Sequence, residues 1–131
     1  MNQSAKAPQK ILIVDDDPVT LRLLEGFLQR AGYQMLLAKE GRAAVALAQK
    51  ELPQVIIMDV MMPQVGGLEA LRQLKKAETT QSIPVIIIAA SDHPLVQQES
   101  KQSGAAAFLT KPFSPGRLLT EIKRLVPEPQ P

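Results

Sequence analysis

Charged side chains follow short apolar runs at three separate places in the chain. An aspartate triplet, residues 15–17, follows the apolar run at 11–14. Asp59 follows a second apolar run, and Lys111 comes shortly after a third. Clustered carboxylates attract a divalent cation, and an ammonium group binds phosphoryl oxygens. If the three segments meet in the fold, these side chains are suited to holding a divalent cation and a phosphoryl group.

The apolar runs indicate how these segments are brought together. Runs of four or five apolar residues bounded by turn signals are typical of strands that are buried on both faces of a parallel sheet. Ligand sites in such sheets lie at the carboxyl ends of the strands. The aspartates and the lysine all stand at the carboxyl end of a run, so we expect them at one edge of one sheet.

Strands and helices are predicted to alternate along almost the whole chain. The predicted strands cover residues 10–14, 34–38, 55–59, 85–89 and 107–109. The predicted helices run from about residue 18 to the stop at Gly32, and then over 42–51, 68–76, 94–103 and 114–125. Asp17 is the predicted cap of the first helix, with Pro18 at its first position. Five strand–helix units with short connections predict a doubly wound α/β fold with helices on both faces of the sheet.

Length and composition are those of one ordinary globular domain. The chain has 131 residues, of which 45% are apolar and 21% charged. We expect residues 1–9 to form a flexible leader and residues 10–126 to form a single domain. Residues 127–131 are rich in proline and are expected to be an extended tail or the start of a linker.

Several classes of function are disfavoured by the composition. The net charge is only +2 and the basic residues are scattered, with no run longer than Lys75-Lys76, which argues against nucleic-acid binding. Without cysteine, neither a disulfide framework nor a thiolate metal site is available. The N-terminal residues lack an apolar signal core, and no segment approaches membrane-spanning length. We therefore expect a soluble cytoplasmic protein without membrane contact.

Three motifs follow one another along the chain. They are Ile13-Val14-Asp15-Asp16-Asp17-Pro18, then Ile57-Met58-Asp59-Val60-Met61-Met62-Pro63 with Gly66-Gly67-Leu68, and finally Gly104 through Phe108 into Lys111-Pro112-Phe113. In this order and spacing, the chain resembles the receiver domain of two-component response regulators over about residues 10–126, in particular the single-domain, chemotaxis-regulator-like kind. The resemblance implies a flavodoxin-like (βα)5 sandwich whose five-stranded parallel sheet has the order 2-1-3-4-5. The family's peptide bond before Pro112 is usually cis, and the sequence leaves this isomer open.

The resemblance also implies a role for each charged residue. Asp59 would be the phosphoryl acceptor, and the protein would be a phosphoacceptor rather than a turnover enzyme. A Mg²⁺ ion would be held by Asp16 directly, by Asp15 partly through water, by Asp59 and by the backbone carbonyl of Met61. Lys111 would pair with Asp59 in the unmodified protein and with the phosphoryl group afterwards. Magnesium favours such an environment of hard oxygen ligands that retains water.

One position departs from the family pattern. Ala89 stands at the end of the fourth predicted strand, where receivers almost always have serine or threonine. In the family, this hydroxyl binds a phosphoryl oxygen and couples the site to a switch aromatic, whose position is taken here by Phe108. Alanine cannot donate this hydrogen bond, which is worth roughly 1.5–3 kcal/mol, so we expect an atypical switch. Ser91, two residues further on, is a candidate for supplying a hydroxyl or a water contact.

Three other functions fit parts of the sequence. The first is a receiver-like protein-interaction module that is not controlled by phosphorylation; Ala89 favours it, whereas the retained acids and Lys111 disfavour it. The second is a haloacid-dehalogenase-type phosphatase, because residues 15–19 fit the Asp-x-Asp-x-Val motif of that family. That enzyme would need a cap domain, and Asp59 has no comparable role in it. A flavodoxin-like cofactor binder is less suited, since the loop after the first strand lacks glycines and hydroxyls to hold phosphate.

Partners follow from the same resemblance. A sensor histidine kinase or a phosphotransfer protein would donate the phosphoryl group. A downstream protein would bind the face formed by the fourth helix, the fifth strand and the fifth helix. Neither nucleic-acid contact by this domain nor membrane contact is expected, and a homodimer is left open.

Overall fold

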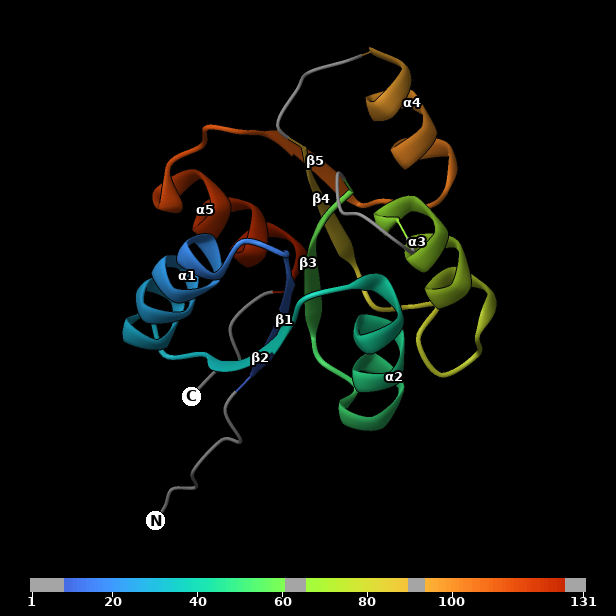
Figure 1. Ribbon diagram of the computed structural model, residues 1–131. Helices are drawn as coiled ribbons and strands as arrows, with labels where there is room; N and C mark the ends of the chain where they lie inside the picture. The colour runs from blue at the N-terminus through green and yellow to red at the C-terminus, as the bar shows by residue number, and fades with distance from the viewer. Residues whose placement is uncertain (1–8, 61–65, 90–93, 127–131) are drawn as a thin grey trace.

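Within residues 9–60, 66–89 and 94–126, which the computed structural model describes, five parallel strands form one sheet with helices on both faces (Figure 1). The strands are β1 (Lys10–Val14), β2 (Gln34–Ala38), β3 (Val55–Asp59), β4 (Val85–Ala89) and β5 (Ala107–Thr110). The helices are α1 (Pro18–Arg30), α2 (Gly41–Glu51), α3 (Gly67–Lys76), α4 (Pro94–Gln102) and α5 (Pro115–Leu125). The strand order β2-β1-β3-β4-β5 confirms the predicted doubly wound, flavodoxin-like fold.

The strand residues alternate between two hydrophobic cores, one on each face of the sheet. Leu12, Ile56 and Ile87 belong to the core that includes residues of α2 and α3. Their sequence neighbours Ile13 and Ile57 belong to the core that includes residues of α1 and α5. Figure 1 accordingly shows α1 and α5 on one side of the sheet and α2 and α3 on the other. Because both faces are covered, the strands are continuous apolar runs in the sequence.

The register of the strands places their carboxyl ends at one level. The last residue of β1 pairs with Met58 of β3, so the next residues on the two strands, Asp15 and Asp59, lie at the same edge. On the other side of β3, the ladder continues past the end of β4. There the backbone N–H of Lys111 donates to the carbonyl oxygen of Ala89 at 2.7 Å. The residues that the sequence placed at strand ends therefore share one edge of the sheet.

Capping residues account for where α1 begins and ends and for where α5 begins. The predicted cap Asp17 is confirmed, because its carboxylate accepts a hydrogen bond from the backbone N–H of Val19 at 3.2 Å. Gly32 follows α1 with a φ of +103°, a conformation that favours glycine. The last helix begins one residue later than predicted because Ser114 is its cap and accepts from the backbone N–H of Arg117. The other predicted bounds agree with the structure or differ by single residues.

Two of the predicted segments lie at the ends of the chain. Apart from Gln9, the predicted leader is outside the described residues, and so is the predicted tail at 127–131. Among the helices of the described ranges, none combines the length and the apolar character that crossing a membrane requires.

Candidate phosphoryl and metal site

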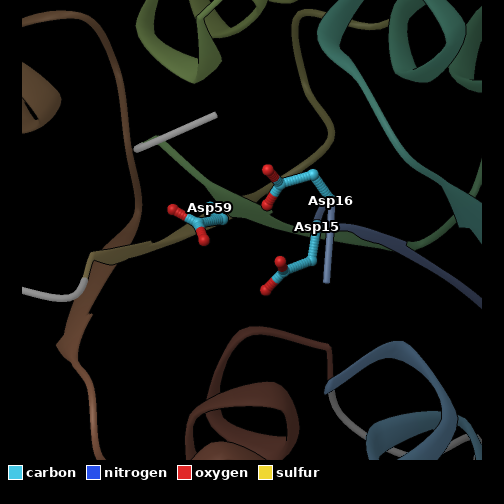
Figure 2. A group of neighbouring side chains, drawn as sticks. All are labelled: Asp15, Asp16 and Asp59. Atoms are coloured by element: carbon cyan, nitrogen blue, oxygen red, sulfur yellow. The ribbon is translucent and has the colours of Figure 1, made fainter. Parts of the chain in front are cut away.

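Three carboxylates gather at the carboxyl ends of β1 and β3. One oxygen each from Asp15, Asp16 and Asp59 lies within 4.8 Å of the other two. Figure 2 shows the three side chains projecting into the same space beside the strand ends. Asp15 and Asp59 are buried, with relative exposures of 3% and 6%, whereas Asp16 is exposed. Hard oxygen ligands at this spacing, with one side open to water, are compatible with Mg²⁺.

Lys111 lies between the two buried carboxylates. Its Nζ donates to Oδ2 of Asp15 and to Oδ2 of Asp59, at 3.0 Å in both cases. The predicted contact with Asp59 is therefore present, and the contact with Asp15 is one that the sequence did not predict. Partial burial acts to lower the pKa of Lys111, but the hydrogen bonds and charges of the two aspartates outweigh it, so this pKa is raised.

The backbone at the start of α1 holds Asp15 in place. Its Oδ1 accepts a hydrogen bond from the backbone N–H of Asp17 at 2.9 Å, while Oδ2 faces Lys111. The Asp17 carboxylate is directed to its own helix instead and accepts from the Thr20 hydroxyl at 2.7 Å. The Thr20 hydroxyl, followed by the Val19 N–H, lowers the pKa of Asp17. Asp15 and Asp16 thus belong to the carboxylate cluster, whereas Asp17 caps α1.

The cluster remains negatively charged despite the lysine. Within the described part of the chain, the three carboxylates have one ammonium group beside them, that of Lys111, and like charges within a few ångströms repel each other. A divalent cation would relieve this repulsion, so the donor set fits a hard metal ion by charge as well as by ligand type.

The two predicted switch residues occupy the same face of the sheet. Ala89 is fully buried at the end of β4. Phe108, on the adjacent β5, is half-buried and packs against the core on the α2–α3 side. Phe108 lines a groove of about 220 Å³ together with residues of α4, of the segment before β5 and of β5 itself. These residues are Gln97, Lys101, Ala105, Ala106 and Ala107. The candidate residues Met61 and Ser91 lie outside the described residues.

An apolar groove beside Lys111 was not predicted from the sequence. It has a volume of about 460 Å³ and is lined by Thr20, Leu23, Leu24, Lys111, Pro112, Phe113 and Pro115. The Lys111-Pro112 peptide bond on its rim is cis. Leu23 and Val19 of α1 are exposed by 68% and 62%. Their signal in the sequence was two apolar residues on the helix face opposite to the buried Leu21, Leu24 and Leu28.

Similar proteins are receivers. A family model described as the response regulator receiver domain matches residues 11–123. Protein PilH of Pseudomonas aeruginosa is 41% identical over 117 residues, which cover 89% of this chain and 97% of PilH. Chemotaxis protein CheY4 of Vibrio cholerae is similar in structure, with a TM-score of 0.87 and 36% identity over 92% of this chain and all of that chain. The receiver domain of a sensor histidine kinase from Pseudomonas aeruginosa, with a magnesium ion coordinated in its active-site cleft, gives a TM-score of 0.86 and 30% identity, covering 93% of this chain and all of that chain.

The site agrees with these similarities, because its acidic cluster is compatible with a magnesium ion. Receiver domains act in two-component signalling, where they interact with histidine kinases or phosphotransfer proteins and with downstream targets. The family model matches nearly the whole chain, and the similarity to PilH covers almost all of that protein. This chain therefore belongs to the family of response regulator receiver domains.

Proposed function

We propose that Asp59 accepts a phosphoryl group from a histidine kinase or a phosphotransfer protein. The observation that carries this proposal is the position of the Asp59 carboxylate, which lies in the acidic cluster and in contact with Lys111. In the step, an oxygen of Asp59 bonds to phosphorus while the bond from phosphorus to the donor's histidine nitrogen breaks. The imidazole leaves with the bonding electron pair and takes up a proton. The protein is then a phosphorylated signal and not a turnover enzyme.

Lys111 and the neighbouring aspartates would have complementary roles in this step. Lys111 holds Asp59 in the unmodified protein and would bind a phosphoryl oxygen afterwards, where it neutralises charge that develops during transfer. A bound Mg²⁺ ion would supply further neutralisation of the phosphoryl oxygens. The exposed Asp16 is suited to direct coordination. Both oxygens of Asp15 already accept hydrogen bonds, which favours a contact through water. The Met61 carbonyl remains part of this proposal.

The donor would approach along the apolar groove beside Lys111. Leu23, which lines this groove, is a large apolar side chain that remains exposed, and Val19 is a second exposed apolar residue of the same helix. Exposed apolar side chains that adjoin a reactive site are typical of a surface that docks a protein. A downstream protein would bind the α4–β5–α5 face, where Phe108 and Lys101 line the groove of about 220 Å³.

One observation favours a second function. Ala89 is buried where the family has a hydroxyl, so this position cannot donate a hydrogen bond to the phosphoryl group. In the second reading, the chain is a receiver-like interaction module whose binding does not depend on phosphorylation. The two readings differ in whether the unmodified sequence takes up phosphate at all.

The test is mass spectrometry of the intact protein after treatment with acetyl phosphate or phosphoramidate and Mg²⁺. We expect one added phosphoryl group in the wild type and none in Asp59→Asn. Asp17→Asn is the matched control, because Asp17 caps α1 and should not be needed for labelling. Labelling that persists in Asp59→Asn or that maps to Asp15 would support the phosphatase alternative. A folded wild type that takes up no phosphoryl group would support the interaction module.

A further inference from the structure

Gly67, the first residue of α3, lies against the backbone of the proposed acceptor. A Cβ atom at this position would lie 2.6 Å from the carbonyl oxygen of Asp59 and 2.6 Å from Cα of Val60. It would also lie 3.0 Å from Cγ1 of Val60. The first two are backbone atoms, which cannot turn away as the end of a flexible side chain could. Only a residue without a Cβ therefore allows α3 to begin this close to the end of β3.

The neighbouring glycine shows that this requirement is specific. Among the described residues, no atom lies within 4 Å of the place that a Cβ at Gly66 would occupy. Gly67 belongs to α3 and is not among the residues with positive φ, so its backbone conformation is open to any amino acid. Alanine is favoured over glycine by about 1 kcal/mol in helices, and local preference would therefore select against glycine here. Gly67 is required by the space beside Asp59 and not by the conformation of the chain.

The backbone that Gly67 contacts is anchored on its other sides. The N–H of Val60 donates to the carbonyl oxygen of Ile88 on β4 at 3.0 Å. The Asp59 side chain is held by Lys111, which comes from the end of β5. A Cβ at residue 67 would displace the Asp59–Val60 peptide. The other charged groups follow different strands and would keep their positions. The carboxylate would then move relative to Lys111 and to the other two aspartates.

We infer that Gly67 is a positioning residue for phosphoryl transfer, because its missing side chain lets α3 set the place of the Asp59 carboxylate in the cluster. The inference rests on the proposed function in that Asp59 is taken as the acceptor. Misplacement of a reacting group by about 1 Å costs up to about 10²-fold in rate, so even a fraction of this shift should be measurable.

The experiment compares Gly67→Ala with the matched control Gly66→Ala. The initial rate of labelling by acetyl phosphate is measured at saturating Mg²⁺, and the affinity for Mg²⁺ by calorimetric titration. For Gly67→Ala we expect a rate reduced by about tenfold or more and weaker Mg²⁺ binding. For Gly66→Ala we expect both values within about twofold of the wild type, because its Cβ meets no neighbour among the residues that the structure describes.

Rates are expressed per folded molecule, with the folded fraction taken from urea unfolding. Should Gly67→Ala be largely unfolded, trimethylamine N-oxide restores the folded state before the same measurements, because this osmolyte is excluded from protein surfaces. A purely structural role predicts a wild-type rate and affinity per folded molecule, and that result overturns the inference. If the wild type itself is not labelled, the proposed function fails, and the Mg²⁺ affinities alone decide. Equal affinities then overturn the placement of the Asp59 carboxylate by Gly67, and a weaker affinity in Gly67→Ala supports that placement alone.

Discussion

The ammonium group of Lys111 contacts both buried carboxylates at the strand ends, and its removal is the sharpest test at the scale of one residue. Lys111→Met removes the ammonium group that pairs with the buried Asp15 and Asp59. We expect the metal-free protein to lose about 3 kcal/mol, the lower end for breaking a buried ion pair. Added Mg²⁺ should stabilise the variant more than the wild type, because the ion binds only the folded form and replaces the missing charge.

Urea unfolding with and without Mg²⁺ measures both effects. Lys10→Met is the control, since Lys10 forms a partly exposed pair with Glu51 whose loss should cost less than about 1 kcal/mol. Its response to Mg²⁺ should equal that of the wild type. An identical Mg²⁺ response in Lys111→Met and wild type would mean that the metal does not bind beside this lysine.

At the scale of the elements, the sequence predicted nearly everything that local patterns encode. The strands β1, β3 and β4 are largely buried apolar runs, and α1, α2, α3 and α5 each pack an apolar face on the core. All ten predicted elements are present in the described ranges. The bounds differ from the predicted ones by single residues, and at Ser114 a side-chain cap accounts for the difference. That Asp15, Asp59 and Lys111 would converge was predictable, because parallel strands end at one edge.

Contacts that depend on the relative placement of distant segments were not predictable. The hydrogen bond from Lys111 to Asp15 joins residues that are 96 positions apart, so no local sequence pattern predicts it. The close approach of Gly67 to Asp59 depends on how α3 packs against the end of β3. A glycine pair in a loop suggests flexibility as readily as close contact, so only the structure distinguishes Gly66 from Gly67.

The C-terminal end of α3 offers a prediction at this scale. Lys75 fastens the turn between α3 and β4, since its Nζ donates to the carbonyl oxygens of Gln81 at 3.0 Å and Ile83 at 2.7 Å. Desolvation by burial lowers the pKa of Lys75 below its ordinary value of 10.5. The folded protein therefore loses this proton before the unfolded chain does. The contribution of Lys75 to the free energy of unfolding is therefore lower at neutral pH. It rises as the pH increases through the folded-state pKa toward 10.5.

We expect Lys75→Met to cost about 1–3 kcal/mol at pH 7, because two carbonyl groups lose their donor. The gap in unfolding free energy between wild type and Lys75→Met should widen as the pH approaches 10.5, since only the wild type gains from losing the proton. Urea unfolding of both proteins at neutral and alkaline pH measures this gap. A gap that narrows with pH would mean that the charged form of Lys75 is the one that the fold prefers.

At the scale of the whole molecule, the site and the α4–β5–α5 face are connected through two strands. Ala89 and Phe108 lie on the same face of the sheet, because alternate residues of β4 and β5 point to the same side and Phe108 pairs with Ile87. Under the proposed function, a hydroxyl at residue 89 would link a phosphoryl group on Asp59 to this aromatic ring. A modification shifts a two-state equilibrium only through contacts that differ between the states, and here one such contact is missing.

Ala89→Thr should therefore strengthen the response of the α4–β5–α5 face to phosphorylation. Ala89→Val is the matched control, because valine has nearly the shape of threonine but no hydroxyl; both substitutions add volume to a fully buried position and should cost about 1–3 kcal/mol of stability. The measurement is the change in amide NMR shifts over residues 94–113 when beryllofluoride, a phosphoryl mimic, is added with Mg²⁺. We expect a larger change in Ala89→Thr than in either wild type or Ala89→Val. If the wild type already responds as strongly as Ala89→Thr, the coupling to Phe108 runs through packing and needs no hydroxyl at this position.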